Sequence, residues 1–376
     1  MSSPTPSIQA KNHYSILDGL RGVASVIVIF FHVFETHALG DRFKQIINHG
    51  YLAVDFFFLL SGFVVAYAYD DRWGSLTQWD FYKRRLIRLQ PMVVIGSIIG
   101  AALVGFQHSS LAFPGLETAS IGKILLLMII GATLIPVPIS MDIRGWNEMH
   151  PLNGPAWSLF FEYIANILYA IGIRRFSKTV LSIFVSITGL MLIAYLVLGA
   201  QGDLIGGWSL SKEQLFIGFT RVLFPFFAGV LLLRVGKLIR IKNAFWWSSF
   251  LIVIVLSIPR IGDAQHVWMN GVYDALCVIV LFPIIVSIGA GGNLENEKAK
   301  KICSFLGDLS YPLYITHYPI MYIYTAWVAN NHLVMQPYAL FVGLLVVVLS
   351  VLLAYACLKI YDEPVRKWLQ NKFLNA

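Results

Sequence analysis

Long runs of apolar residues, separated by short polar connections, make up most of this chain. Several of the runs approach the roughly 20 residues that an α-helix needs to cross a bilayer, and a few are shorter. Their spacing predicts an all-α fold, a polytopic bundle of transmembrane helices. The eleven runs cover residues 22–39, 50–69, 91–107, 121–138, 155–172, 179–200, 213–235, 244–259, 268–290, 304–328 and 336–358.

The composition agrees with a membrane protein and excludes an ordinary water-soluble enzyme. Of 376 residues, 57% are hydrophobic and 13% are charged, whereas soluble domains have about 25% charged residues. The net charge of +8 would suit nucleic acid, but the basic residues stand in short clusters between apolar runs, so no nucleic-acid partner is expected. The three cysteines are far apart and lack CxxC spacing, which predicts neither a disulfide framework nor a metal site.

The basic clusters predict how the helices are oriented. Cytoplasmic connections of membrane proteins carry an excess of Lys and Arg, and all the clusters reach the cytoplasm only if the stretch 91–154 makes one net crossing. One of its two short runs, 91–107 or 121–138, is therefore expected to be re-entrant or half-spanning. We predict about ten spanning helices with both termini cytoplasmic, in the inner (cytoplasmic) membrane. The clusters lie at residues 83–88, 174–178, 234–242, 297–301 and 365–372.

This topology divides the chain into three parts. The polar stretch 1–14 is expected to be a disordered cytoplasmic N-terminus. Residues 15–364 form the transmembrane domain, and residues 365–376 form a cytoplasmic C-terminal tail.

Six ionisable residues, one from each of six apolar runs, stand at similar depths in the predicted membrane. A charge at the centre of a bilayer costs at least about 2.5–3.5 kcal/mol, so such residues suggest function. A rise of about 1.5 Å per residue puts all of them between the midplane and the outer face. We therefore expect one layer of ionisable side chains that forms a site. The six are His32, Asp55, Glu162, Arg221, Asp274 and His317.

His32 is the strongest catalytic candidate. Glu35 follows it by three residues on the same helical face, and a neutral imidazole oriented by a carboxylate is the usual arrangement of a general base. A histidine that only packs between helices is the alternative. His317 suits a second base, a hydrogen bond to substrate or a structural role.

The other four members of the layer have structural alternatives as well. Glu162 and Arg221 also suit a buried ion pair that joins helices. Asp55 and Asp274 stand near the ends of their runs, where simple solvation would explain them. Trp157 follows a polar turn at 153–155, where its ring could stack on a sugar.

An arginine cluster opens the run that begins at residue 91. Arg85 and Arg88 are three residues apart, on one helical face, and guanidinium groups suit phosphate oxygens. Topological anchoring by cations that reach the membrane surface is the alternative.

Five stretches of the sequence resemble the acyltransferase-3 family of integral membrane acyltransferases. Residues 17–35, LDGLRGVASVIVIFFHVFE, place Arg21 and His32 with ten residues between them, as in the R-x10-H signature of that family. The other four stretches follow in the family's order, and together the five span essentially the whole chain. They are YLAVDFFFLLSGFVVAY (51–67), FYKRRLIRLQP with its R-x-x-R (81–91), NGPAWSLFFEY (153–163) and LGDLSYPLYITHYPI (306–320).

The resemblance implies an enzyme that moves an acyl group, typically acetyl, from cytosolic acyl-CoA to a hydroxyl of a carbohydrate or other cell-envelope molecule. It implies acyl-CoA as the donor substrate, with no bound cofactor and no metal. Some members carry a fused extracytoplasmic hydrolase-like domain, and this chain is expected to be the stand-alone form. The resemblance implies His32 as the catalytic histidine with Arg21 as its motif partner, Arg85 and Arg88 on the acyl-CoA side, and Glu162 and His317 at the core site. Together with the residues singled out from the sequence itself, the predicted site comprises the catalytic residues His32, Arg21, Glu162 and His317, the acyl-CoA-binding residues Arg84, Arg85 and Arg88, and the lining residues Glu35, Asp55, Trp157, Arg221, Asp274 and Tyr311.

These expectations combine into one mechanism. The donor would leave its phosphates near Arg85 and Arg88 and extend its acyl arm toward His32, where an acceptor from outside would meet it. His32 would remove the hydroxyl proton during attack or carry the acyl group transiently; we favour the base. The alternative function is a secondary transporter or exporter of a polar or glycan-like substrate. Its expected mark, paired broken helices in two related halves, is not evident in the sequence.

Overall fold

The computed structural model describes residues 13–294 and 296–374, and this part of the chain is an all-α bundle. The predicted disorder of residues 1–12 lies outside the described residues. The helices follow the apolar runs. They are α1 (Ser15–His37), α2 (Ala53–Tyr69), α3 (Gln78–Leu103), α4 (Ile121–Thr133), α5 (Ala156–Ile171), α6 (Lys178–Leu198), α7 (Lys212–Val235), α8 (Ala244–Ser257), α9 (Trp268–Leu276), α10 (Phe282–Gly291), α11 (Glu297–Thr316), α12 (Tyr318–Asn330), α13 (Pro337–Ala356) and α14 (Glu363–Phe373).

The prediction of a polytopic membrane bundle is confirmed. Over residues 13–294 and 296–374, seven helical stretches are long and apolar enough to cross a membrane, by length and composition, and α4, α5 and α8 are shorter apolar helices. Two of the long stretches are continuous through π-helical segments, Cys277–Leu281 between α9 and α10 and Cys357–Asp362 between α13 and α14. The predicted C-terminal tail is therefore largely helical.

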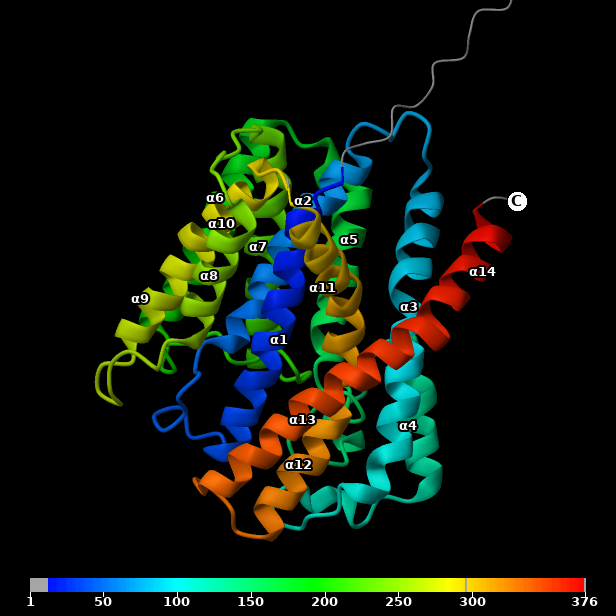
Figure 1. Ribbon diagram of the computed structural model, residues 1–376, viewed down its shortest axis with the longest axis vertical. Coiled ribbons are helices and arrows are strands. Elements are labelled where there is room, and N and C mark those ends of the chain that lie inside the picture. Colours follow the sequence, from blue (N-terminus) through cyan, green and yellow to red (C-terminus); the bar gives the residue numbers. More distant parts are fainter. Residues whose placement is uncertain (1–12, 295, 375–376) are drawn as a thin grey trace, which may run out of the picture.

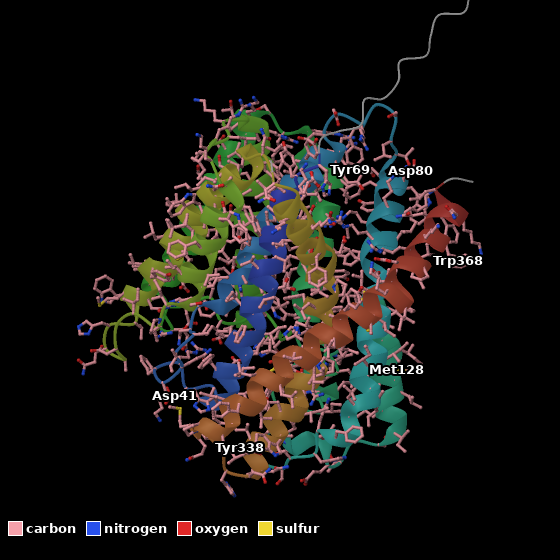
Figure 2. All side chains as sticks on the ribbon, viewed as in Figure 1. Asp41, Tyr69, Asp80, Met128, Tyr338 and Trp368 are labelled. Carbon is pink, nitrogen blue, oxygen red and sulfur yellow. The ribbon has the colours of Figure 1, made fainter. Side chains whose placement is uncertain are left out.

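The two ends of the bundle differ in charge. Asp80 and Trp368 lie at one end, which we call the inner end, whereas Asp41 and Tyr338 lie at the opposite, outer end (Figure 2). At the inner end Arg234 donates to Asp70 and to the carbonyls of Arg174 and Phe176, so two of the basic clusters meet there. Two of the clusters on which the topology was predicted therefore stand at one end of the bundle, and the orientation of that end in the membrane stays a prediction.

Helix α4 runs along only the outer half of α3. The side chain of Gln90 donates to the carbonyl of Ala132 at 2.6 Å, and that of Ser97 donates to the carbonyl of Met128 at 2.9 Å. The last turn of α4 therefore stands level with Gln90, near the middle of α3. Its 13 residues make a helix of about 20 Å, less than the hydrocarbon thickness of a bilayer.

The run predicted at 304–328 is divided into two helices at His317. Pro319 has no N–H with which to bond the carbonyl of Ile315, four residues earlier. The side chain of Asn153 donates to that carbonyl instead, at 2.8 Å. The break is thus stabilised by the polar turn before α5, and it leaves His317 at the junction of α11 and α12.

Close helix crossings fix the centre of the bundle, where α1 lies beside α11 and α13 crosses obliquely in front of them (Figure 1). A Cβ at Gly22 would lie 2.4 Å from the carbonyl oxygen of Leu306, so α1 and α11 touch through backbone. A Cβ at Gly62 would lie 1.8 Å from the carbonyl oxygen of Phe226, which joins α2 to α7 in the same way. Small residues permit such approaches between membrane helices, and these four helices carry most of the site.

Candidate active site

Two of the cavities among the described residues extend from opposite ends of the bundle toward its centre. The inner cavity has a volume of about 350 Å³ and the outer cavity about 580 Å³. Val54 of α2 and Tyr314 of α11 line both, so the two cavities meet at this pair. The hydroxyl of Tyr314 lies 2.7 Å from that of Ser158 on α5, which fixes the shared wall.

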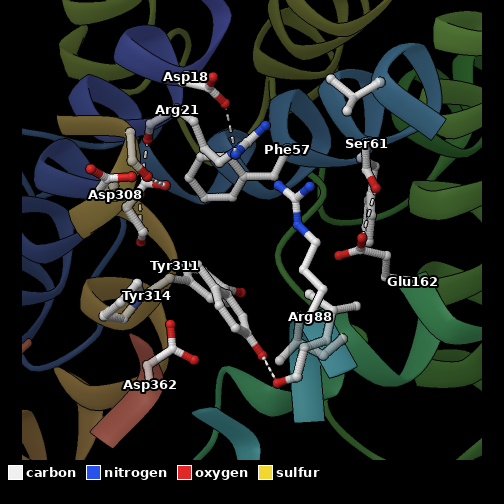
Figure 3. Close-up of a pocket in the computed structure, with 18 of the residues that line it drawn as sticks. Asp18, Arg21, Phe57, Ser61, Arg88, Glu162, Asp308, Tyr311, Tyr314 and Asp362 are labelled. Carbon is white, nitrogen blue, oxygen red and sulfur yellow. Dashed lines mark hydrogen bonds and ion pairs between the residues drawn. The ribbon is translucent and has the colours of Figure 1, made fainter. Parts of the chain in front are cut away.

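Four arginines and four carboxylates are among the residues that line the inner cavity, and Figure 3 shows several of them. Arg21 on α1 lies 3.3 Å from Asp18, and Arg85 on α3 donates to Glu162 at 2.7 Å. Arg88 is exposed within the cavity, and no hydrogen bond or ion pair between described residues occupies its guanidinium, which points toward Phe57 and the centre of the space. This combination suits an anionic ligand, because a partnerless guanidinium keeps all five of its N–H donors available.

Glu162 belongs to the inner cavity. Its Oε1 atom accepts hydrogen bonds from Arg85 at 2.7 Å and from the hydroxyl of Ser61 on α2 at 2.6 Å. The alternative pairing of Glu162 with Arg221 is therefore wrong. Tyr311 lines the same cavity and donates from its hydroxyl to the carbonyl of Leu89 at 2.6 Å, which ties α11 to α3.

Histidine, carboxylate and aromatic side chains line the outer cavity. His32 and Glu35 come from α1, and they face a set of aromatic rings. Large rings with a polar edge suit hydroxylated ligands that also present apolar faces. The rings include those of Trp146, Trp157, Trp208, Tyr318 and Tyr322.

His32 is held as a general base would be. Its Nδ1 atom lies 2.7 Å from Oε2 of Glu35. Because a carboxylate only accepts, Nδ1 carries the proton and Nε2 keeps a free lone pair. The ring packs edge-on against Tyr318, with centroids 4.8 Å apart, and its side chain is 18% exposed. The i, i+3 spacing on α1 supplies this geometry locally.

His317 lies behind His32. The two imidazoles stack with centroids 5.5 Å apart, and Nδ1 of His317 lies 3.0 Å from the carbonyl oxygen of Leu313, to which it must donate. The side chain is fully buried, and in the described part of the chain it is absent from the lining of both cavities. His317 therefore supports the His32 ring, and its direct catalytic role stays a prediction.

Arg221 is paired with Asp55 beneath the outer cavity. Its Nη2 donates to Asp55 at 2.7 Å and to the carbonyl of Tyr51 at 2.7 Å, and its Nη1 donates to the carbonyl of Gly206 at 3.1 Å. The guanidinium lies 5.0 Å from the ring centroid of Trp157, a cation–π contact. Arg221 thus binds the loop after α6 to α2 and positions the cavity wall.

The loop between α4 and α5 adds a carboxyl group to the outer cavity. Glu148 accepts a hydrogen bond from the hydroxyl of Tyr322 at 2.6 Å, and Nε of Arg144 lies 3.7 Å from the same oxygen. Burial raises the pKa of Glu148 to about 8, against the lowering effects of Arg144 and of the bond from Tyr322. Its carboxyl is therefore mostly protonated at neutral pH.

Comparison with known proteins identifies the family of this chain. A family model described as an acyltransferase domain matches residues 14–355. The chain belongs to acyltransferase family 3.

Two kinds of relative accompany this assignment. "Protein 2 in picA locus" of Rhizobium radiobacter is 34% identical over 193 residues, which cover 48% of this chain and 94% of that protein. The O-acetyltransferase OatA of Staphylococcus aureus is 22% identical over 364 residues, which cover 93% of this chain and 57% of that protein. A putative O-acetyltransferase of Staphylococcus aureus strain COL is 23% identical over 378 residues, with the same coverage. The chain spans little more than half the length of these O-acetyltransferases, and no solved structure matches it.

The R-x10-H signature of this acyltransferase family acquires a geometric meaning here. Eleven residues make about three helical turns, so Arg21 and His32 project from one side of α1 about 16 Å apart. Arg21 lines the inner cavity and His32 the outer one. Helix α1 thus contributes one residue of the signature to each of the two cavities.

The structure divides the predicted layer of six ionisable residues. His32 and Arg221 line the outer cavity, and Glu162 lines the inner one. Asp55 and Asp274, which were predicted to line the site, are fully buried, so the alternative that solvent exposure explains them is wrong. Asp274 accepts a hydrogen bond from the hydroxyl of Tyr51 at 2.8 Å.

Arg84 differs from the other two arginines predicted to bind the donor. It is exposed and, among the described residues, it is not part of the lining of the inner cavity. The motif spacing alone could not have shown this, because Arg84 and Arg88 are four residues apart and project only about 40° from each other on a helix.

Sequence reasoning missed several residues of both cavities. Tyr314 lies within the stretch 306–320, and its position three residues before His317 was an available signal. Glu148 comes from an irregular loop, where no periodic pattern marks orientation. Asp362 and Arg366 line the inner cavity from beyond the last apolar run, and only their i, i+4 spacing suggested a pair.

Proposed function

We propose that this protein is a membrane-bound O-acyltransferase, with acetyl-CoA as the first donor to test. The donor enters the inner cavity from the cytoplasm and the acceptor hydroxyl enters the outer cavity. The observation that carries the proposal is the position of His32, oriented by Glu35 in the outer cavity, whose lining includes the two residues shared with the inner cavity. The similarity to O-acetyltransferases supports the reaction class.

The proposed topology has about ten crossings, with the inner end of the bundle in the cytoplasm. The half-length of α4 supports 121–138 as the half-spanning segment, and both termini then lie in the cytoplasm. This orientation, in a cytoplasmic membrane, directs the arginine-rich cavity toward the compartment that holds acyl-CoA.

The reaction follows from the two cavities. Nε2 of His32 accepts the proton of the acceptor hydroxyl while the hydroxyl oxygen attacks the thioester carbonyl carbon. The carbon–sulfur bond then breaks, and the CoA thiolate receives a proton from the imidazolium and leaves through the inner cavity. Glu35 stabilises the imidazolium through its hydrogen bond to Nδ1.

The acceptor is proposed to be a carbohydrate or related cell-envelope molecule. The outer cavity offers rings and hydrogen-bonding groups around His32, and Arg221 is already engaged by Asp55. A hydroxylated ligand with few or no anionic groups suits this lining better than a polyanion does.

Reconstitution with the two substrates on opposite sides of a membrane tests the proposal. Proteoliposomes would hold labelled acetyl-CoA inside and a panel of neutral oligosaccharides outside. We expect alkali-labile label on an external acceptor only from liposomes in which the inner end faces the lumen. Translocation of unmodified oligosaccharide without ester formation would instead identify a transporter.

Acid-quenched enzyme distinguishes the two roles of His32. With labelled acetyl-CoA and no acceptor, base catalysis leaves the peptide that contains His32 unlabelled. Stoichiometric label on that peptide would replace the direct transfer with an acyl-histidine intermediate.

A further inference from the structure

The C-terminal helix reaches the inner cavity from beyond the matched family region. That region ends at residue 355, whereas one continuous helical stretch runs from Pro337 to Phe373. Its last part, α14, packs against α3, the helix that carries Arg85 and Arg88. The wall of the inner cavity therefore includes a segment that the family match does not cover.

Two charged side chains of this segment line the cavity. Asp362 ends the π-helical segment, and Arg366 follows one turn later on α14. Nη2 of Arg366 lies 2.8 Å from Oδ2 of Asp362. Figure 3 shows the Asp362 carboxylate beside the cavity, on the side of Tyr311.

This ion pair is only partly satisfied. Oδ1 of Asp362 and Nε of Arg366 are buried atoms with no hydrogen-bond partner among the described residues. The Asp362 side chain is 3% exposed, whereas that of Arg366 is 33% exposed. The buried Asp362 carboxylate thus holds Nη2 of a guanidinium that is itself one-third exposed, and its second terminal nitrogen, Nη1, has no partner among the described residues.

The charges around the inner cavity single out Arg366 and Arg88. Arg85 is more deeply buried and is bound to Glu162, and Arg21 is close to Asp18. Arg88 has no hydrogen-bond or ion-pair partner among described residues, and Asp362 is near enough to interact with its charge. Among the described residues, Arg88 on α3 is therefore the guanidinium without a partner, and Arg366 on α14, at 33% exposed, is the most accessible of the three paired arginines of the cavity.

We propose that Arg366 binds a phosphate group of the acyl-CoA donor, with Asp362 as its positioning residue. The inference rests on the proposed function of the inner cavity. Acyl-CoA carries several phosphate charges, and a planar guanidinium binds phosphate oxygens through paired N–H donors. Arg366 of α14 and the R-x-x-R of α3 would together bind the nucleotide end of the donor. The acyl arm of the donor would then extend toward Val54 and Tyr314.

Binding measurements on the full-length protein in nanodiscs of zwitterionic lipid test this role. Arg366→Gln is expected to weaken CoA binding about 10–150-fold, the range for loss of a charge-assisted hydrogen bond. Binding of pantetheine, which has the thiol arm but no phosphate, is expected to stay unchanged. Asp362→Asn should weaken CoA binding less, because Arg366 keeps its charge and loses only its orientation.

Lys367→Gln is the matched control. Lys367 is the next residue of α14, exposed and, as far as the described residues go, absent from the cavity lining. The Lys367→Gln variant removes one positive charge from the same helix, as Arg366→Gln does. It is expected to leave CoA affinity within about twofold, since an exposed charge in salt is well screened. Equal weakening by both variants would overturn the proposal in favour of general electrostatic attraction.

The possible outcomes separate this proposal from the proposed function. Unchanged CoA affinity in Arg366→Gln, with binding by the unaltered protein, overturns the role of Arg366 and leaves the function intact. No CoA binding by the unaltered protein contradicts the function itself. If Arg366→Gln does not fold, Arg366→Lys keeps the charge without the planar fork, and a CoA affinity equal to that of the unaltered protein would overturn the proposal. A defect that appears only with anionic lipid present would identify a lipid headgroup as the ligand.

Discussion

The inner and outer cavities hold their charges in different ways. Arginines and carboxylates alternate around the inner cavity, and partners such as Arg85 and Glu162 lie within hydrogen-bond distance at its surface. In the outer cavity the main ion pair, Arg221 with Asp55, lies in the wall, and His32 stands among aromatic rings. The difference indicates one site for a highly charged ligand and one for a polar but weakly charged ligand, and His32 lines the second.

The two cavities also differ in how far their arginine–carboxylate pairs are buried. The side chains of Arg221 and Asp55 are 2% and 0% exposed, so the pair is structural. Those of Arg85 and Glu162 are more accessible, and Glu162 also holds Ser61 of α2. A buried pair mainly affects folding when it is broken, whereas a pair at a cavity surface can be rearranged by a ligand.

Removal of the imidazole is expected to have the largest effect on activity. His32→Ala should lower kcat for acyl transfer by about 10²–10⁴-fold, the usual contribution of a positioned base. The affinity for CoA should not change, because His32 lies in the outer cavity. Steady-state CoA release and a CoA titration on the same preparation would measure the two quantities. Glu35→Gln should give a smaller loss, since the amide oxygen can still accept from Nδ1.

A variant that lost CoA affinity and kcat together would contradict the separation of the two cavities. Full activity of His32→Ala would remove His32 from the mechanism altogether.

Breaking the structural ion pair is expected to have the next largest effect. Arg221→Met leaves Asp55 as an uncompensated buried charge, which costs about 3–5 kcal/mol of unfolding free energy. Adding Asp55→Asn should recover part of this loss, because the remaining side chain is neutral. Arg85→Met should destabilise the protein less and weaken CoA binding more. Thermal unfolding in detergent, with CoA titrations on the folded fraction, would compare Arg221→Met with Arg85→Met. Equal destabilisation by the two variants would mean that the two ion pairs have the same structural role.

Sequence reasoning predicted local and periodic features well. The apolar runs located the helices, and the i, i+3 spacing was enough to pair His32 with Glu35. Both depend on residues close in the chain, whose relative positions the helical repeat fixes.

Contacts between distant segments were harder to predict. Depth estimates along each helix report position along the membrane normal and carry no information within the membrane plane. They therefore grouped Glu162 with Arg221, although Glu162 contacts Arg85, 77 residues away in sequence. Hydrophobicity also ran unbroken through His317, because the missing hydrogen bond at Pro319 changes the backbone without changing the apolar pattern.

A test of the inner cavity compares two arginines of one cluster. Arg88→Ala should raise KM for acetyl-CoA about 10–150-fold, from the loss of a charge-assisted hydrogen bond to phosphate, with little change in kcat. Arg84→Ala removes an equal charge four residues earlier, from an exposed position, and should leave KM nearly unchanged. Initial rates at varied acetyl-CoA and fixed acceptor would show the difference. Similar KM values for both variants would mean that the cluster acts only as a topological anchor.

The smallest expected effect concerns the carboxyl group in the outer cavity. In the unfolded chain Glu148 ionises near its ordinary pKa of 4.5, whereas in the folded protein burial raises its pKa to about 8. Between these values the folded state binds more protons, so this group makes the unfolding free energy fall as pH rises, by at most about 1.4 kcal/mol per pH unit, and adds no further slope above pH 8.

Glu148→Gln keeps the hydrogen bond from Tyr322 and removes this titration. The difference in thermal midpoint between Glu148→Gln and the unaltered protein, measured from pH 5 to 9, should therefore grow with pH and then level off. A constant difference would mean that Glu148 is ionised in the folded protein, paired with Arg144. The outer cavity would then hold a paired charge as the inner cavity does, and the argument for a weakly charged acceptor would lose one of its supports.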